Sequence, residues 1–279
     1  MKKMYIWIIG IILVLSVSAQ AKTYDLVLMH GLTNKHHWSD SFLSKAAEIW
    51  GTGNVYVVFS NSSTRVWTRT INGRLITFCG ENDFTGGDGY VWDQSNLIAA
   101  KITKLKTSYG LSAKFNVVAH SMGGLVMRYY AWTHPNTVAG LVTLGTPHHG
   151  SSLASAADFL FLDWFLGADH AMEHLKPSWV NNYFNVNYPV SGMPMADSGK
   201  VYTITGDGDG WIWECWGWGG ELFAGWPILL VAEGDNDGLV SHSASKITGA
   251  TDIGTFWDYD HYDLVKQASV MVKAAAYLR

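Results

Sequence analysis

The chain has 279 residues and a formal net charge of −4, and only 15% of its residues are charged. A slightly acidic chain offers a polyanion little electrostatic attraction, so the composition argues against a nucleic-acid partner. Its 14 tryptophans indicate either a large aromatic core or apolar surface that serves binding.

The first 21 residues have the pattern of an export signal. Lys2 and Lys3 form a charged start, Met4–Val17 is apolar, and Ala19-Gln20-Ala21 is a small-residue cleavage pattern. An uncleaved membrane anchor is the alternative, although the apolar run is short for crossing a bilayer. We therefore expect cleavage after the last alanine of this pattern, and secretion of residues 22–279 as one soluble domain.

Apolar segments alternate with helical ones along residues 22–279. The expected strands are Asp25–Met29, Val55–Phe59, Phe115–Ala119, Ala139–Leu144, Val201–Thr205 and Ile228–Ala232. The expected helices are Asn96–Tyr109, Gly123–Trp132 and Tyr262–Leu278. This alternation favours a single α/β domain with a mostly parallel, doubly wound sheet.

Two segments interrupt the alternation. Asn72–Asp93 is rich in glycine and polar residues and is expected to be a long excursion. Residues 151–200 include the apolar run Asp158–Leu166, which is too short to span a membrane and too apolar for a solvated loop. It is either a core helix or a mobile lid. We expect a lid-bearing helical cap over roughly residues 151–200, because lids gate substrate access.

The hexapeptide Ala119-His120-Ser121-Met122-Gly123-Gly124 follows an apolar strand and opens a helical stretch. A serine between small residues at such a turn is the pattern of a nucleophile elbow, in which the serine oxygen stands exposed above a sheet. Ala119 replaces the glycine that is usual two positions before the serine. The pattern predicts that Ser121 is a catalytic nucleophile.

A serine nucleophile needs a histidine base, which a carboxylate orients. In α/β-hydrolases the order along the chain is serine, acid, histidine. The histidines after Ser121 that fit poorly are His134 on the serine's own helix, His148 and His149 on a turn, His170 and His174 in the insertion, and His242 close behind the candidate acid. His261 remains, in a loop before the last expected helix.

The candidate acid lies in Gly234-Asp235-Asn236-Asp237-Gly238-Leu239-Val240, after the strand expected to end at Ala232. A glycine-flanked carboxylate at the end of a strand is where a triad acid belongs. Asp237 leads and Asp235 is its competitor. The backbone N–H groups of Met122 and Leu32 would form the oxyanion hole, although His30-Gly31-Leu32 also fits an ordinary strand-end turn.

Cys79 and Cys215 are the two cysteines of the chain. In an exported protein they predict one disulfide, which would contribute about 4–5 kcal/mol on the chain-entropy model. Two buried free thiols are the alternative.

Four ordered motifs together resemble the secreted bacterial triacylglycerol lipases. They are Met29-His30-Gly31-Leu32, the hexapeptide around Ser121, Leu144-Gly145-Thr146-Pro147-His148-His149-Gly150-Ser151 and Asn236-Asp237-Gly238-Leu239-Val240. The resemblance is weakest over residues 60–95 and 150–225. It implies an α/β-hydrolase fold, hydrolysis of carboxylic esters without a catalytic cofactor, and a lipid-like substrate. Ser121, Asp237 and His261 fall on that family's triad positions.

Many members of that family hold a structural calcium near the catalytic histidine. The resemblance implies Asp263 and Gln267 as its ligands, with a main-chain carbonyl near Met271 as a further candidate. Oxygen ligands suit this cation. A further carboxylate stays open between Asp207, Asp209, Glu214 and Glu221. In the alternative, Asp263 caps the last helix and Gln267 lies on its surface. A zinc site at His148 and His149 would need two more ligands, which we cannot identify.

The leading hypothesis is a secreted lipase or esterase that touches a lipid–water interface transiently. An aliphatic polyester depolymerase and a short-chain esterase are the enzymatic alternatives. A tryptophan-rich binding protein on an inactive hydrolase scaffold is the remote one. The tract Trp211–Trp218 departs from what the family predicts, so the sequence does not define which acyl group the enzyme accepts. It also does not define whether a dedicated folding helper is needed.

Overall fold

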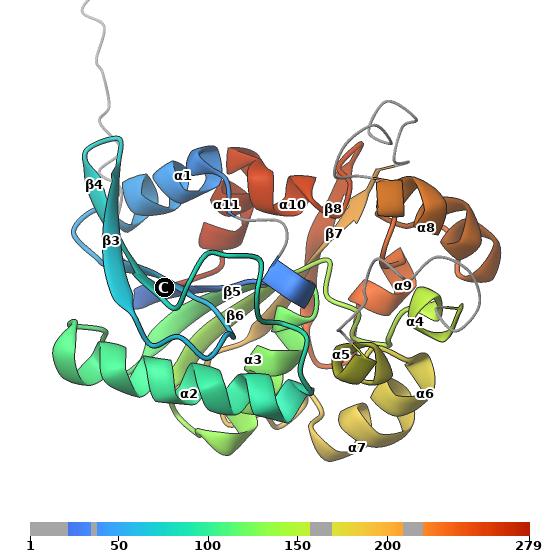
Figure 1. Cartoon of the computed structure of the whole chain (residues 1–279), viewed down its shortest axis with the longest axis horizontal. Helices are drawn as coiled ribbons and strands as arrows, with labels where there is room; N and C mark the ends of the chain where they lie inside the picture. Colours follow the sequence, from blue (N-terminus) through green and yellow to red (C-terminus); the bar gives the residue numbers. More distant parts are fainter. Residues whose placement is uncertain (1–21, 35–37, 157–168, 209–219) are drawn as a thin grey trace, which may run out of the picture.

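The computed structural model of the chain describes residues 22–34, 38–156, 169–208 and 220–279 (Figure 1). The expected export signal, the apolar run Asp158–Leu166 and the tract Trp211–Trp218 lie outside these residues. Within the described residues, no helix is long and apolar enough to span a bilayer.

One eight-stranded sheet organises the described residues, in the order β3-β4-β2-β1-β5-β6-β7-β8. Its strands are β1 Asp25–Met29, β2 Val55–Val58, β3 Val66–Ile71, β4 Arg74–Cys79, β5 Phe115–His120, β6 Val138–Leu144, β7 Val201–Asp207 and β8 Thr251–Trp257. β3 runs antiparallel to β4, and the other neighbouring strands pair in parallel. The predicted mostly parallel sheet is confirmed.

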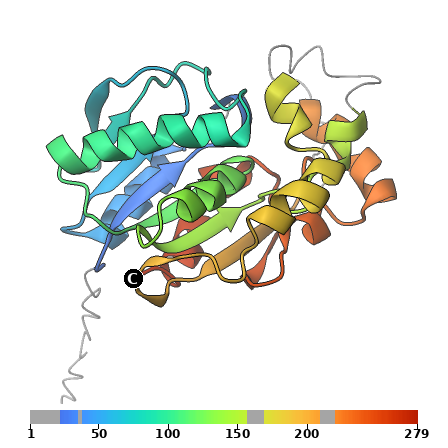
Figure 2. The ribbon, with the colours of Figure 1, turned by 90° about the horizontal axis from the view of Figure 1, so that it is seen from below.

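Helices cover both faces of the sheet (Figures 1 and 2). α1 Asp40–Trp50, α10 Asp263–Lys266 and α11 Ala268–Ala275 cover one face, and α2 Val91–Ser108 and α3 Gly123–Thr133 cover the other. Alternate residues of β1 point to the two faces of the sheet. Leu26 and Leu28 pack in the core beneath α1, α10 and α11, and Val27 and Met29 pack in the core beneath α2 and α3. A strand buried on both faces therefore appears as one continuous apolar run.

The strand order reverses beside β1. From β1 the chain passes to β2 and the hairpin on one side, and it returns to β5 on the other side. The carboxyl ends of β1 and β5 therefore meet at a topological switch point, where ligands bind in open α/β sheets. His30 follows β1, and Ser121 follows β5.

The expected strand Ile228–Ala232 is wrong. These residues form the second half of helix α8, Gly220–Ala232. A short, unbroken apolar run has no period that separates a buried strand from a helix. The eighth strand is Thr251–Trp257, which was not expected. The expected last helix is also interrupted, because Gln267 is extended (ψ 127°) between α10 and α11.

The expected excursion Asn72–Asp93 begins with the turn and the second strand, β4, of a β-hairpin. Asn72 (φ 49°) and Gly73 (φ 77°) form the turn between β3 and β4. An Asn-Gly pair is the preferred sequence of such a two-residue turn, because both residues adopt positive φ. The hairpin therefore had a signal in the sequence.

Short helices fill the insertion between β6 and β7. They are α4 Ser152–Ala156, α5 Asp169–Glu173, α6 Pro177–Trp179, the π-helical turn Val180–Phe184, α7 Asn185–Asn187 and the 3₁₀ turn Ala196–Ser198. Arg128, buried in α3, donates hydrogen bonds to the Tyr188 carbonyl (2.7 Å) and to Asn185 Oδ1 (3.1 Å). Burial lowers the pKa of its guanidinium to about 9. Arg128 thereby fastens the insertion to the helix that follows Ser121.

Cys79 lies in β4 and is wholly buried in the core beneath α2. Burial raises the pKa of its thiol. Cys79 is a free cysteine in the structure, which does not support the predicted disulfide; Cys215 lies outside the described residues.

Candidate active site

Ser121 occupies the turn between β5 and α3 with a φ of +53°. A non-glycine residue in this left-handed region costs about 1–3 kcal/mol, so the surrounding structure must hold it there. Its N–H donates to the Leu144 carbonyl (2.8 Å), and its own carbonyl accepts from the Thr146 hydroxyl (2.8 Å). The backbone on both sides of the serine is therefore fixed by the end of β6.

Two glycines make this turn possible. A Cβ at Gly123 would lie 2.2 Å from the His30 carbonyl oxygen, and one at Gly124 would lie 2.1 Å from Thr146 Oγ1. Only glycine permits such close approach. Ala119, which takes the place of the usual glycine, lies within β5 and is wholly buried.

His261 and Asp237 form a buried pair. His261 Nδ1 lies 2.8 Å from Asp237 Oδ2, and each residue is 1% exposed. The other carboxylate oxygen accepts the N–H groups of Leu239 (3.1 Å) and Val240 (2.8 Å). The loop's own backbone thus orients the acid. The competitor Asp235 is exposed and lies beside His242 instead.

His120 connects the serine turn to this pair. Its ring centroid lies 4.5 Å from that of His261, and its Nε2 donates to the His261 carbonyl (2.9 Å). Within the described part of the chain, no hydrogen bond joins the Ser121 hydroxyl to His261; such bonds often tighten only when substrate binds. His120 directly precedes the serine, but no local pattern indicates this role.

The loop after β1 lies against Ser121. A Cβ at Gly31 would lie 2.6 Å from Ser121 Cβ. His30 Nε2 accepts the Ser60 N–H (2.9 Å), so Nδ1 carries the proton and donates to the Gly31 carbonyl (2.6 Å). The Gly31 carbonyl and the Leu32 N–H belong to the same planar peptide group, so this hydrogen bond also fixes the direction of the Leu32 N–H. His30 is therefore a second residue that sequence reasoning missed.

The two side chains predicted to bind calcium, Asp263 and Gln267, lie next to each other. Asp263 begins α10, and the exposed Gln267 donates its amide N–H to the Asp263 carboxylate (3.3 Å). Among the described residues, no group of histidine or acidic side chains with metal-binding spacing includes Asp263. Met271 is buried in α11, Asp209 and Glu214 lie outside the described residues, and the Glu221 side chain is not described. The predicted calcium site therefore stays a prediction.

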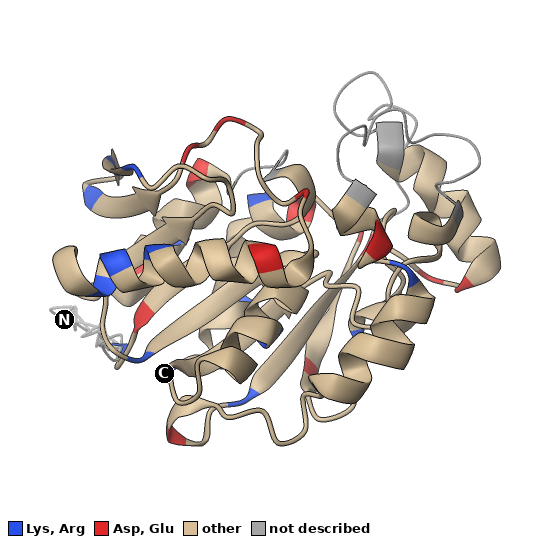
Figure 3. Cartoon of the chain, turned by 60° about the horizontal axis from the view of Figure 1, so that its bottom comes forward, with Lys and Arg blue, Asp and Glu red and all other residues tan. Residues whose placement is uncertain are grey.

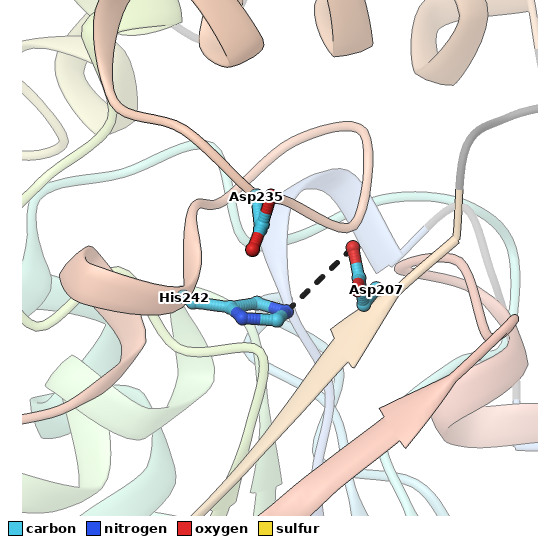
Figure 4. Close-up of side chains that lie close together, drawn as sticks. All are labelled: Asp207, Asp235 and His242. Atoms are coloured by element: carbon cyan, nitrogen blue, oxygen red, sulfur yellow. Dashed lines mark ion pairs between the residues drawn. The ribbon is translucent and has the colours of Figure 1, made fainter.

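Asp207 has different neighbours from those that the calcium prediction gave it. It ends β7 beside Asp235 and His242, and one ligand atom from each of the three lies within 4.8 Å of the others (Figure 4). His242 Nε2 donates to the Gly206 carbonyl (2.9 Å) and lies 3.8 Å from Asp207 Oδ1. An imidazole between two carboxylates is a plain ion-pairing arrangement, and we assign no metal to it.

The chain belongs to the α/β-hydrolase family, because residues 26–171 match the family model described as the alpha/beta hydrolase fold. Two curated relatives are triacylglycerol lipases, from Pseudarthrobacter phenanthrenivorans and Burkholderia plantarii. Each is 23% identical over 92% of this chain, which spans 80% and 71% of their respective lengths.

Solved structures agree with this family. The mature lipase BlEst2 of Bacillus licheniformis superposes with a TM-score of 0.66 at 23% identity, covering 93% of this chain and 94% of that one. The metagenomic carboxyl esterase MGS0156 has a TM-score of 0.57 at 16% identity, covering 92% and 76%. At these identities the structures show the fold. Family, relatives and fold together identify the chain as an α/β hydrolase of the lipase and esterase type, as its motifs predicted.

Proposed function

We propose that this protein is a secreted carboxylic-ester hydrolase that cleaves triacylglycerols or similar water-insoluble esters through an acyl-enzyme on Ser121. The observation that carries the proposal is the buried Asp237–His261 pair, which His120 connects to the strained serine turn. Secretion rests on the export pattern of residues 1–21.

The proposed mechanism uses both nitrogens of His261. Because Nδ1 is engaged by Asp237, Nε2 is the atom that takes the proton from the Ser121 hydroxyl as its oxygen attacks the ester carbonyl. Nε2 then returns the proton to the leaving alcohol. Next it takes a proton from the water that attacks the acyl-enzyme, and it gives this proton to the Ser121 oxygen as the acyl–oxygen bond breaks, which regenerates the serine.

The Leu32 and Met122 N–H groups are proposed to hold the oxyanion. The Gly31 loop lies against Ser121, and the His30 bond fixes its peptide plane. Loss of one such donor typically lowers turnover about 10²–10³-fold. The calcium that the resemblance implies is structural, so no step of the proposed mechanism is assigned to it.

Helix α8 supports a water-insoluble substrate. Its exposed positions include Phe223 (44%), Ile228 (40%), Leu230 (41%) and Val231 (90%), while Leu222 and Leu229 are buried. The helix contains no lysine or arginine, and it is drawn without blue at the right of Figure 3. Apart from Glu221 near its start, α8 has apolar residues on all sides. A helix of this kind is normally buried, so its exposed side fits an apolar surface.

The buried side of α8 packs against the loop that carries Asp237. A Cβ at Gly225 of α8 would lie 2.2 Å from the Gly238 carbonyl oxygen. The nearby side chains of Glu233 and Asp235 are acidic, so an uncharged ester surface suits this region better than an anionic membrane. We propose that α8 rests on that surface while the substrate enters the site.

Substitution of Ser121 by alanine tests the function. Ser121→Ala is expected to lower kcat for a soluble p-nitrophenyl ester by about 10⁴-fold or more, because the nucleophile is lost. The matched control Ser108→Ala, on the surface end of α2, is expected to keep the wild-type rate. A serine-directed phosphonate is expected to label the wild-type and control proteins only. Turnover that survives in a folded Ser121→Ala variant would exclude the mechanism.

Rates of the wild-type protein on three substrates define the ester class. We expect emulsified triglyceride to be hydrolysed faster than an aliphatic polyester film or a dissolved short-chain ester. Preference for the film would identify a polyester depolymerase, and exclusive use of the dissolved ester would identify a short-chain esterase.

A further inference from the structure

Glu233 joins two parts of the molecule that are far apart in sequence. It follows α8 directly and is half-buried. One carboxylate oxygen accepts the N–H of Ser152, the first residue of α4 (2.8 Å), and the other accepts the hydroxyl of Ser241 (2.5 Å). One side chain therefore bonds both the start of the insertion and the far end of the Asp237 loop.

Ser241 closes the loop that carries the acid. It is wholly buried, pairs with Asn236 in an antiparallel bridge, and caps α9 (His242–Ser245) by accepting the Ala244 N–H (3.1 Å). Between these ends, the Asp237 N–H donates to the Val240 carbonyl (3.1 Å). A displacement of Ser241 therefore moves the backbone that orients the Asp237 carboxylate.

A second tie runs parallel to the first. The Ser151 hydroxyl donates to the Leu239 carbonyl (2.8 Å), and Leu239 supplies one of the N–H groups that the Asp237 carboxylate accepts. On the opposite side of the loop, the His261 N–H donates to the Asp237 carbonyl (2.9 Å). The loop is thus held between the insertion and the histidine.

We propose that Glu233 is a positioning residue that couples the first helix of the insertion to the aim of the Asp237 carboxylate at His261. This inference rests on the proposed function, since it assigns a regulatory contact to the same site. Through its two hydrogen bonds, Glu233 keeps Ser152 of α4 and Ser241 of the Asp237 loop in a fixed relative position.

The test replaces Glu233 by methionine, which has a similar length and no hydrogen-bonding oxygen. Because small misplacements of catalytic groups are costly, kcat of Glu233→Met for a soluble p-nitrophenyl ester is expected to fall about tenfold, with KM unchanged within about twofold. The downfield proton NMR signal of the Asp237–His261 hydrogen bond is expected to shift or broaden. Glu233→Gln is expected to recover part of the rate, because its amide can still accept from Ser152 and donate to Ser241.

Glu173→Met is the matched control, because Glu173 also lies in the insertion and pairs with Lys176 (2.8 Å) away from the acid loop. It is expected to keep both the rate and the NMR signal. If Glu233→Met fails to fold, Ser151→Ala removes the parallel tie to Leu239, together with the acceptor of the Leu153 N–H (3.3 Å), and should lower kcat in the same direction.

Wild-type kcat and NMR signal in a folded Glu233→Met protein would overturn the inference, as would an equal loss in the control. An inactive wild-type protein would instead refute the proposed function, and the NMR comparison would still decide the coupling.

Discussion

At the scale of single residues, glycines shape the site as much as its polar groups do. Gly31 leaves room for Ser121, and Gly145, which follows β6, leaves room for the buried pair. A Cβ at Gly145 would lie 2.8 Å from Asp237 Oδ2 and 3.0 Å from His261 Nδ1. A methyl group there must displace one partner of that hydrogen bond.

Gly145→Ala is therefore expected to lower kcat about 10–100-fold, because it separates the acid from the histidine and strains a backbone of φ +54°. Initial rates on a soluble ester measure the effect. Gly192→Ala is the control for backbone strain alone, since Gly192 has φ +80° and a Cβ there would meet no atom within 4 Å. Equal rates in the two variants would show that crowding at the pair is unimportant.

At the scale of elements, His174 fastens the insertion to the start of α2. Its Nδ1 accepts the Val91 N–H (3.0 Å), and its ring stacks on Trp179 at a centroid distance of 3.7 Å. Burial lowers the pKa of His174 to about 4. Protonation would remove the acceptor and leave a charge among aromatic rings.

This contact predicts a loss of stability in acid. The unfolded chain takes up the proton near pH 6.5 and the folded chain near pH 4, so the stabilisation is complete above pH 6.5 and is lost as the pH falls to 4. The total is on the order of 3 kcal/mol. His174→Gln retains an acceptor that does not titrate, so urea unfolding should show a smaller decrease in stability between pH 7 and 4.5.

His170→Gln, at an exposed position of α5, is the control for that measurement. His170 is only the smallest of the influences on the His174 pKa, so the acid loss should stay close to that of the wild-type protein. An unchanged acid loss in His174→Gln would assign the effect to other groups. One such group is the wholly buried His148, whose pKa burial also lowers.

At the scale of the whole molecule, the apolar side of α8 and the β3–β4 hairpin lie at opposite ends of the structure (Figure 1). Val231 is 90% exposed on α8, and Leu75 is 62% exposed on β4. Val231→Asp is expected to lower the rate on emulsified triglyceride at least about fivefold, since it removes apolar contact worth roughly 1–2 kcal/mol and adds a charge. Its rate on a dissolved ester should stay unchanged. Leu75→Asp should alter neither rate, and a loss in both variants would reject α8 as the contact surface.

Much of the fold was predictable because its signals are local. The central strands are continuous apolar runs, and the helices after them show a helical period. Prediction failed at Ile228–Ala232, where an apolar run carries no period, and at the Asn72-Gly73 turn, whose signal was overlooked. The choice of Asp237 rested partly on a strand before it that is helix α8, although its glycine-flanked loop was recognised correctly as a loop.

The candidate site shows the same division. The sequence by itself determined the residue types and their order, Ser121 before Asp237 before His261, because the elbow and the glycine-flanked acid are local patterns. It could not determine that Asp235 faces His242, that Asp263 and Gln267 bond to each other, or that Glu233 reaches both Ser152 and Ser241. Those contacts join segments that only the packed sheet brings together, and their distances depend on chain paths that no local pattern encodes.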